Sequence, residues 1–140
     1  MKRSFLGATT PRIKTFKKKN IITFVGKLNK SKGYDIFGNA IIKVLNKHKK
    51  WSSIVVGDEP RDKLNFKHNR LLHLGWITHD QTMNVYKKSS ISVVPSHWDE
   101  PFGRSSLEAS SRGNAVILSK KGGLPETIRN PIFLKNVNHK

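Results

Sequence analysis

The sequence predicts an α/β fold in which a parallel sheet is covered by helices on both faces. Two observations carry this prediction: short apolar runs alternate with longer segments of helical spacing, and the short runs are almost continuously apolar. Alternating strands and helices form βαβ units. Strands that are apolar on both sides are typical of sheets buried on both faces. The length of 140 residues fits one domain with a substantial core.

The first half of the chain gives two strands and one helix. A β-branched, apolar run at 21–25 predicts the first strand. Apolar side chains three and four positions apart predict a helix over 34–47. A second strand is expected at 53–56. The following segment, 58–69, is polar and contains Pro60, so we expect irregular structure or a poor helix there.

The third strand is expected at 70–74, followed by a helix with a clear start signal. Thr78 and Gln81 have the spacing of a capping box, in which each side chain bonds the other residue's backbone N–H group. This predicts a helix that begins there and ends near Lys88. A fourth strand is expected at 91–94.

The last part of the chain repeats the alternation. A helix is expected over 104–112, closed by Gly113, because glycine readily takes the left-handed conformation that ends helices. A fifth strand is expected at 115–118. A short turn or helix at 125–129 then leads to a sixth strand at 132–134.

Composition narrows the function classes. Cysteine is absent, which excludes disulfides, thiolate catalysis and cysteine metal sites and favours a reducing cytoplasm. The chain has no apolar run long enough to span a membrane. Its net charge of +18 suggests a nucleic acid or an anionic surface as partner. The ordinary alternative is a lysine-rich background, since 20 lysines stand against 7 arginines and two of the basic runs (47–50 and 87–88) fall at expected helix ends.

Ligands of open α/β sheets bind outside the carboxyl ends of the strands, so the residues there are candidates for a site. Glycines, charged residues and aromatic rings follow the expected strands: Gly26, Lys27 and Lys32 after the first, Asp58 and Glu59 after the second, Gly75 and Trp76 after the third, 95–103 after the fourth, and Gly122, Gly123 and Glu126 after the fifth. Four of the nine acidic residues lie in or beside the last two segments: Asp99, Glu100, Glu108 and Glu126. Their clustering argues against ordinary solvent-exposed charges without a ligand.

The loop that ends at Gly103 enters a helix, and free backbone N–H groups at a helix start bind phosphate. Lys27 and Lys32 could add positive charge to a diphosphate. Glu100 and Glu108 would reach two different parts of one extended ligand, because carboxylates commonly accept from vicinal sugar hydroxyls. These residues therefore predict a site for a phosphorylated sugar compound.

The same residues carry a family resemblance. Glu100-Pro-Phe-Gly-Arg-Ser-Ser-Leu-Glu108 is an E-x7-E motif, accompanied by Gly-Gly-Leu-Pro-Glu at 122–126 and by Gly26-Lys27 with Lys32-Gly33 near the first strand. The combination resembles the C-terminal, donor-binding half of GT-B glycosyltransferases of family 4, the "group 1" family, over about Ile21 to Ile128. The resemblance implies a Rossmann-like parallel sheet flanked by helices, as an incomplete C-terminal half of a GT-B fold.

The resemblance also implies roles for individual residues. Glu100 would contact the donor sugar, and Lys27 and Lys32 would hold the diphosphate and stabilise its charge as it leaves. Glu108 would bind the ribose hydroxyls. The remaining donor-binding residues would present backbone groups or line the base: Gly26, Gly75, Trp76, Ile77, Phe102, Gly103, Arg104, Gly122, Gly123 and Glu126.

The activity implied is a retaining, metal-independent hexosyl transfer without a cofactor, from a nucleotide-diphosphate sugar to a glycan or lipid-linked acceptor. The partner implied is an N-terminal acceptor domain, without which the isolated chain is expected to be inactive. We expect a cytoplasmic location, with peripheral contact at the inner face of the membrane.

Three departures from the family pattern keep alternatives open. Lys27 stands where the family usually has arginine, which keeps the charge but loses the bidentate fork. No acceptor domain is present, and the chain stops soon after Glu126, so we expect a truncated nucleotide-sugar-binding domain at 21–140. Residues 1–20 are polar and basic and contain Pro11, so we expect a linker or tail there. The alternatives are a basic module that binds nucleic acid or an anionic surface without catalysis, and a remnant that folds but binds no donor.

Overall fold

The computed structural model describes residues 16–62, 64–97, 104–119 and 132–133. Six strands form one parallel sheet with the spatial order β3-β2-β1-β4-β5-β6. The strands are β1 (Ile21–Val25), β2 (Ser52–Val56), β3 (Leu71–Gly75), β4 (Ile91–Val94), β5 (Ala115–Leu118) and β6 (Ile132–Phe133). The predicted parallel α/β sheet is confirmed, and each strand lies within about one residue of its predicted position.

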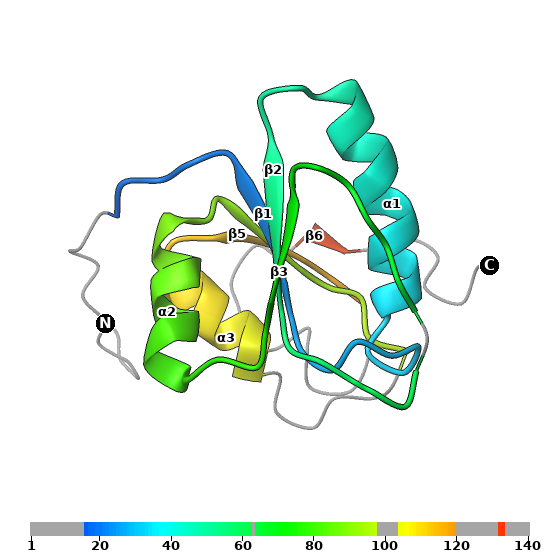
Figure 1. Cartoon of the computed structure of the whole chain (residues 1–140). Coiled ribbons are helices and arrows are strands. Elements are labelled where there is room, and N and C mark those ends of the chain that lie inside the picture. Colours follow the sequence, from blue (N-terminus) through cyan, green and yellow to red (C-terminus); the bar gives the residue numbers. More distant parts are fainter. Residues whose placement is uncertain (1–15, 63, 98–103, 120–131, 134–140) are drawn as a thin grey trace.

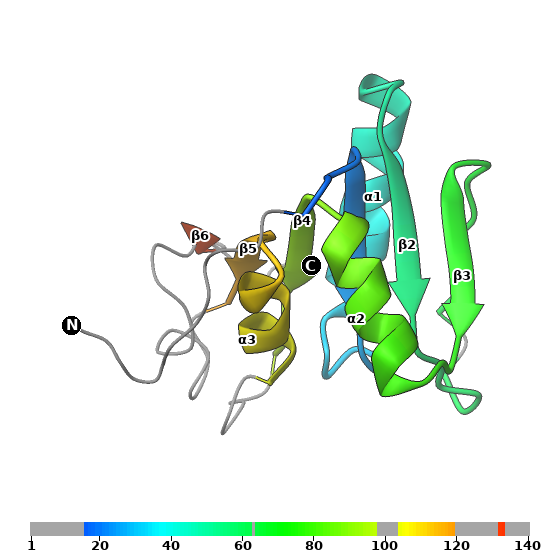
Figure 2. The same cartoon turned by 90° about the vertical axis from the view of Figure 1, so that its left-hand side faces the viewer.

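Helices cover both faces of this sheet, as the continuously apolar strands predicted. In Figure 1, α1 (Tyr34–Lys47) lies on one side of the edge-on sheet, and α2 (His79–Lys88) and α3 (Arg104–Ser111) lie on the other. Figure 2 shows α2 and α3 side by side across the front of the sheet. The longest described helix has 14 residues, and none of the described helices is long and apolar enough to cross a membrane.

The order of the strands creates a topological switch point. The chain moves outward from β1 to β2 and β3, and then returns so that β4 pairs with the other side of β1. At such a point the connections on the two sides leave in opposite directions, and a crevice opens outside the carboxyl ends of the strands. The fold therefore places any ligand site at the ends of β1 and its neighbours.

An aromatic cluster fixes α1 against the sheet. The rings of Phe24 and Tyr34 lie 5.1 Å apart between centroids, and Phe66 meets Tyr34 edge-on at 5.5 Å. Phe66 belongs to the connection between β2 and β3, whose described residues contain neither helix nor strand, as predicted for 58–69. Its ring lies against Gly38 of α1, where a side chain would occupy the same space. This contact closes the core where the fold has no crossover helix.

The predicted signals at helix ends are present. The Thr78 hydroxyl accepts from the backbone N–H of Gln81 at 3.2 Å, and the Gln81 side chain accepts from the backbone N–H of Thr78 at 2.9 Å. This capping box starts α2 at the carboxyl edge of the sheet. Gly113 follows α3 with a φ of 84°, as expected of a glycine that ends a helix.

Candidate functional site

A pocket of about 350 Å³ opens where the carboxyl ends of β1, β2 and β3 meet the start of α2. Its apolar part comes from strand ends and its polar part from the loops that follow them. The lining residues are Val25, Gly26, Lys27, Val56, Gly57, Asp58, Glu59, Trp76, Ile77 and Thr82. The pocket thus brings together four of the residues predicted for the site: Gly26, Lys27, Trp76 and Ile77.

Backbone hydrogen bonds between the strand ends hold the floor of this pocket. The N–H of Gly26 donates to the Val56 carbonyl at 3.0 Å, and the N–H of Gly57 donates to the Gly75 carbonyl at 2.8 Å. Gly57 has a φ of 121°, and a Cβ there would overlap the Gly26 carbonyl. Glycine is needed because the backbones approach so closely. Gly75, another predicted residue, therefore lies beside the pocket and shapes it through its backbone.

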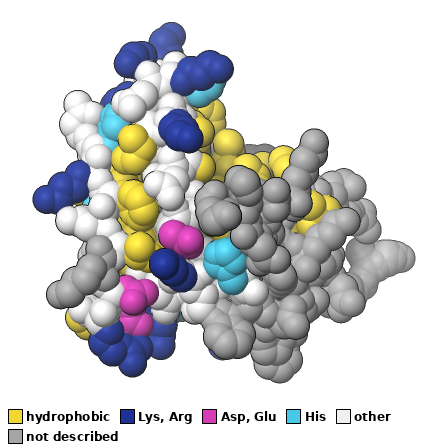
Figure 3. Space-filling view, turned by 90° about the vertical axis from the view of Figure 1, so that its right-hand side faces the viewer, with side chains coloured by type: hydrophobic (Ala, Val, Ile, Leu, Met, Phe, Trp, Pro, Cys, Tyr) yellow, Lys and Arg dark blue, Asp and Glu magenta, His cyan; other side chains and the backbone are white. Residues whose placement is uncertain are grey.

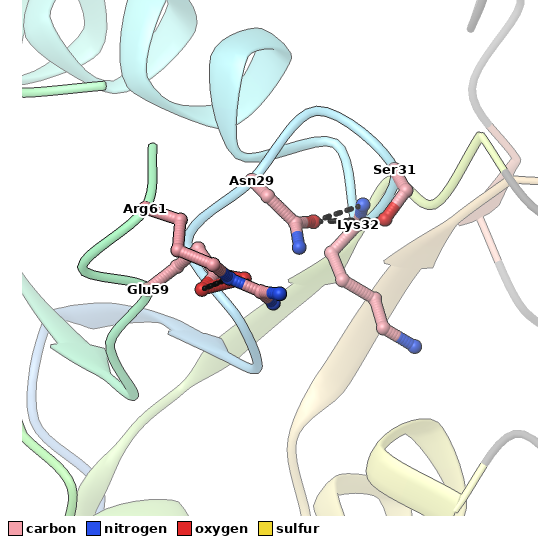
Figure 4. A network of polar contacts seen from close by, with 5 residues as sticks. All are labelled: Asn29, Ser31, Lys32, Glu59 and Arg61. Carbon is pink, nitrogen blue, oxygen red and sulfur yellow. Dashed lines mark hydrogen bonds and ion pairs between the residues drawn. The ribbon is translucent and has the colours of Figure 1, made fainter. Parts of the chain in front are cut away.

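The loop between β1 and α1 positions the two predicted lysines. The Asn29 side-chain oxygen accepts from the backbone N–H of Lys32 at 3.0 Å and from the Ser31 hydroxyl at 2.9 Å (Figure 4). Lys27 lies at the pocket end of this loop and Lys32 at its helix end, next to Gly33, the cap residue of α1. The loop is folded on itself through Asn29, so both lysines belong to one turn that follows β1 at the switch point.

Glu59 follows the second strand and is one of the candidate residues at the strand ends. The structure places Glu59 in the pocket wall, with a side chain only 8% exposed. Arg61 grips it with two hydrogen bonds of 3.0 and 2.9 Å (Figure 4). The hydrogen bonds from Arg61, the charge of Arg61, a hydrogen bond from Asn29 and the charge of Lys27 together lower the pKa of Glu59. An ionised carboxylate therefore stands beside Lys27.

The helix α3 carries two further predicted residues. Arg104 is its first residue and is exposed, and Glu108 lies one turn further along. The Glu108 carboxylate is 3.8 Å from the His79 imidazole at the start of α2. Neither Arg104 nor Glu108 lines the pocket of Lys27 and Trp76; they stand on the neighbouring helix at the same edge of the sheet. Sequence reasoning missed His79, although its place just after a helix cap at the carboxyl edge is a usable signal.

The end of β4 is tied to the lysine loop. The backbone N–H of His97 donates to the Ser31 carbonyl at 2.9 Å, and the His97 ring lies 3.7 Å from the Asp35 carboxylate. The hydroxyl of Ser119, after β5, donates to the Ser96 carbonyl at 2.9 Å. The chain leaving β4 therefore starts next to Lys32. The predicted residues further along lie outside the described residues: Glu100, Phe102, Gly103, Gly122, Gly123 and Glu126.

The chemistry of the described site suits an elongated anion with a flat, partly apolar end. Val25, Val56 and Ile77 offer apolar surface, and Trp76 exposes 75% of its surface at the rim. Lys27 supplies positive charge at one end of that space, and Lys32 lies on the same loop but does not line the pocket. In the part of the chain that the structure describes, no group of three or more histidine or acidic side chains is arranged to hold a metal ion.

Comparisons with known proteins show the family and the fold. The family model described as "Glycosyl transferases group 1" matches residues 8–137. An uncharacterized glycosyltransferase of Methanocaldococcus jannaschii is 33% identical over 119 residues, which are 80% of this chain and 30% of that protein. The chain spans about a third of the length of the curated relatives it matches.

Two solved structures show the same fold. The C-terminal domain of a group 1 glycosyltransferase from Francisella tularensis is 31% identical, with a TM-score of 0.73 over 86% of this chain and 69% of that one. HepE of Anabaena, solved in complex with UDP-glucose, is 21% identical, with a TM-score of 0.69 over 84% of this chain and 35% of that one. The chain therefore belongs to the group 1 glycosyltransferases and has the fold of their C-terminal, GT-B domain.

Proposed function

We propose that the chain is the nucleotide-sugar donor-binding domain of a retaining glycosyltransferase. The observation that carries the proposal is the pocket at the switch point, which joins Lys27 to an apolar space beside Trp76. A nucleoside diphosphate has the matching shape and charge: a flat base at one end and two phosphates at the other. The complex of the related fold of HepE with UDP-glucose supports a uridine nucleotide as the first donor to test.

In this proposal the base enters the pocket beside the Gly75–Ile77 backbone and the Trp76 ring. The diphosphate then lies over Lys27 and Lys32, and the ribose hydroxyls donate to Glu108. As the bond between sugar and diphosphate breaks, negative charge builds on the leaving phosphate. Fixed cations aimed at that oxygen stabilise the transition state more than the bound donor, which is the requirement for catalysis.

The sugar end of the donor is assigned to Arg104 and to residues outside the described part of the chain. Glu100 would contact the sugar, and Phe102, Gly103 and Arg104 would offer backbone N–H groups to it and to phosphate. Gly122, Gly123 and Glu126 complete the proposed donor-binding residues. We propose a hexose-type sugar, a glycan or lipid-linked acceptor supplied with an N-terminal acceptor domain, and no requirement for a metal ion.

Titration of the purified 140-residue chain with UDP, GDP and ADP, followed by their sugar derivatives, tests this proposal by calorimetry. We expect saturable one-to-one binding of at least one nucleotide diphosphate. Glu108→Ala should weaken that binding at least about 10-fold, since a hydrogen bond to a charged group is worth about 1.5–3 kcal/mol. Asp62→Ala removes an exposed carboxylate from a loop and serves as the charge-matched control. Lack of binding to every nucleotide by the folded chain would contradict the proposal.

A further inference from the structure

The amino end of the sheet, opposite the pocket, carries lysines at three neighbouring strand starts. Lys49 and Lys50 precede β2, and Lys47 ends α1 just before them. Lys17 and Lys19 precede β1. All five side chains are exposed. The helices run antiparallel to the strands in βαβ units, so the ends of helices and the starts of strands share this edge.

The third group is Lys87 and Lys88, which end α2 just before β4 and are also exposed. Hydrogen bonds join the three groups into one surface. The N–H of Lys19 donates to the Lys88 carbonyl at 2.8 Å, and the N–H of Ser52 donates to the Asn20 carbonyl at 3.0 Å. Because neighbouring strands lie about 4.8 Å apart, the groups form a continuous row. We call these seven lysines the basic edge.

Negative charge is segregated away from the basic edge. Among the described residues, Asp35 and Asp80 lie in the first turns of α1 and α2, at the carboxyl edge. The loop after β2 carries Asp58, Glu59 and Asp62. Glu108 lies in the middle of α3. In Figure 3, which shows the α1 side, carboxylates lie only in the lower half, beside further lysine and arginine side chains, whereas lysine and arginine side chains gather at the top, at the end of α1, without carboxylates.

Cations other than these lysines donate hydrogen bonds to the terminal helix carbonyls. Cations at helix ends satisfy terminal carbonyls and complement the helix dipole. Two other cations already do this. Arg70 donates to the Leu45 carbonyl at 2.6 Å and to the Lys49 carbonyl at 3.1 Å, and the Lys18 ammonium donates to the Tyr86 carbonyl at 3.0 Å. The lysines of the basic edge therefore add positive charge to an edge whose helix ends are already capped.

We propose that the basic edge docks the protein on a lipid surface that carries negative charge. Clustered lysines attract anionic headgroups without requiring a fixed geometry. Nucleic-acid surfaces more often combine arginine forks with aromatic rings on which bases stack. The basic edge consists of lysines, with the exposed His48 between Lys47 and Lys49. Among the described Phe, Tyr and Trp side chains, the exposed one, Trp76, lies at the opposite edge, and Phe16, whose ring centroid is 5.8 Å from the Lys87 ammonium, is half-buried. The observations thus favour a lipid surface.

Docking by the basic edge leaves the pocket open to solution. The pocket lies at the carboxyl ends of the strands, and a five-residue strand such as β1 is about 16 Å long. A bilayer in contact with the strand starts therefore lies a full sheet length away from the pocket. This inference stands independently of the proposed donor binding.

Co-sedimentation of the 140-residue chain with vesicles tests the proposal. Vesicles of phosphatidylcholine with phosphatidylglycerol should bind the protein, and vesicles of phosphatidylcholine alone should not. Binding should fall as salt is raised toward about 0.15 M, where charges are screened beyond about 8 Å. The variant Lys49→Gln/Lys88→Gln should weaken binding about 30-fold, since each lysine near an anionic surface contributes about a five-fold factor.

The matched control is Lys30→Gln/Arg61→Gln, which removes two exposed charges from the carboxyl edge. It should change vesicle binding less than three-fold by the same scale. Circular dichroism checks that both variants fold. Equal losses in the two variants, no loss in either, or equal binding to uncharged vesicles would overturn the proposal. So would tighter binding to a duplex DNA fragment that the Lys49→Gln/Lys88→Gln variant weakens, because the basic edge would then be a nucleic-acid surface.

Discussion

Replacing Gly33 by alanine is expected to lower the free energy of unfolding by about 3 kcal/mol, through left-handed strain and a steric clash. Gly33 caps α1 with a φ of 78°, where a side chain costs about 1–2 kcal/mol. A Cβ there would also overlap the backbone carbonyl of Pro95, which cannot swing away as a side chain could. The added methyl would push apart the lysine loop and the end of β4, so nucleotide binding should fall together with stability.

Gly75→Ala is the matched control for Gly33→Ala. Gly75 has a similar φ of 69°, but a Cβ there meets nothing within 4 Å. Gly75→Ala should lower the free energy of unfolding only by the cost of the left-handed conformation, about 1 kcal/mol. Urea unfolding measures the free energy of unfolding of both variants. The difference between their losses of stability is the contribution of the clash at Gly33. Equal losses of stability would show that the contact between Gly33 and Pro95 does not constrain the fold.

Lys27→Ala is expected to weaken the binding of a nucleoside diphosphate about 100-fold, from the loss of one charge-assisted contact to phosphate. This loss of affinity should lie near the upper end of the range for charge-assisted contacts because of Glu59. Its ionised carboxylate stands beside Lys27 and would repel the phosphates once the ammonium group is gone. Calorimetric titration measures the change, and binding of the nucleoside without phosphates should stay nearly unaffected.

Two further variants serve as controls for the titration of Lys27→Ala. Lys30→Ala removes an exposed lysine from the same loop, so it tests whether any nearby charge has the same effect. Lys27→Arg keeps the charge and supplies a bidentate fork, so its affinity should equal or exceed that of the wild type. A loss in Lys30→Ala as large as that in Lys27→Ala would contradict a specific phosphate contact at Lys27.

The order and type of the elements could be predicted because local signals and tertiary needs agree. The run at 21–25 is apolar on both sides and becomes a central strand, and Thr78 with Gln81 forms the capping box that its spacing predicted. The same agreement placed Gly26, Lys27, Trp76 and Ile77 at one edge of the sheet. Parallel strands bring their carboxyl ends together, so the residues that follow them converge without any further information.

Other features depend on contacts between distant segments and could not be predicted. The two hydrogen bonds from Arg61 that hold Glu59 in the pocket wall depend on the conformation of an irregular loop. The contact between His79 and Glu108 depends on how α2 lies against α3. Lysine runs were interpreted as helix ends, which is correct for Lys47 and for Lys87 with Lys88. Only the strand order shows that these ends and the start of β1 form one basic edge.

The most direct test of donor binding is a map of the residues that respond to a nucleotide. Amide chemical shifts of the isotopically labelled 140-residue chain, followed while UDP is added, give that map. We predict saturable changes at Gly26, Lys27, Gly57 and Ile77 and along α3 at Glu108, with the basic edge at Lys49 and Lys88 unchanged. Changes confined to the basic edge, or no saturable change with UDP, GDP or ADP, would contradict the assignment of this chain as a nucleotide-sugar donor domain.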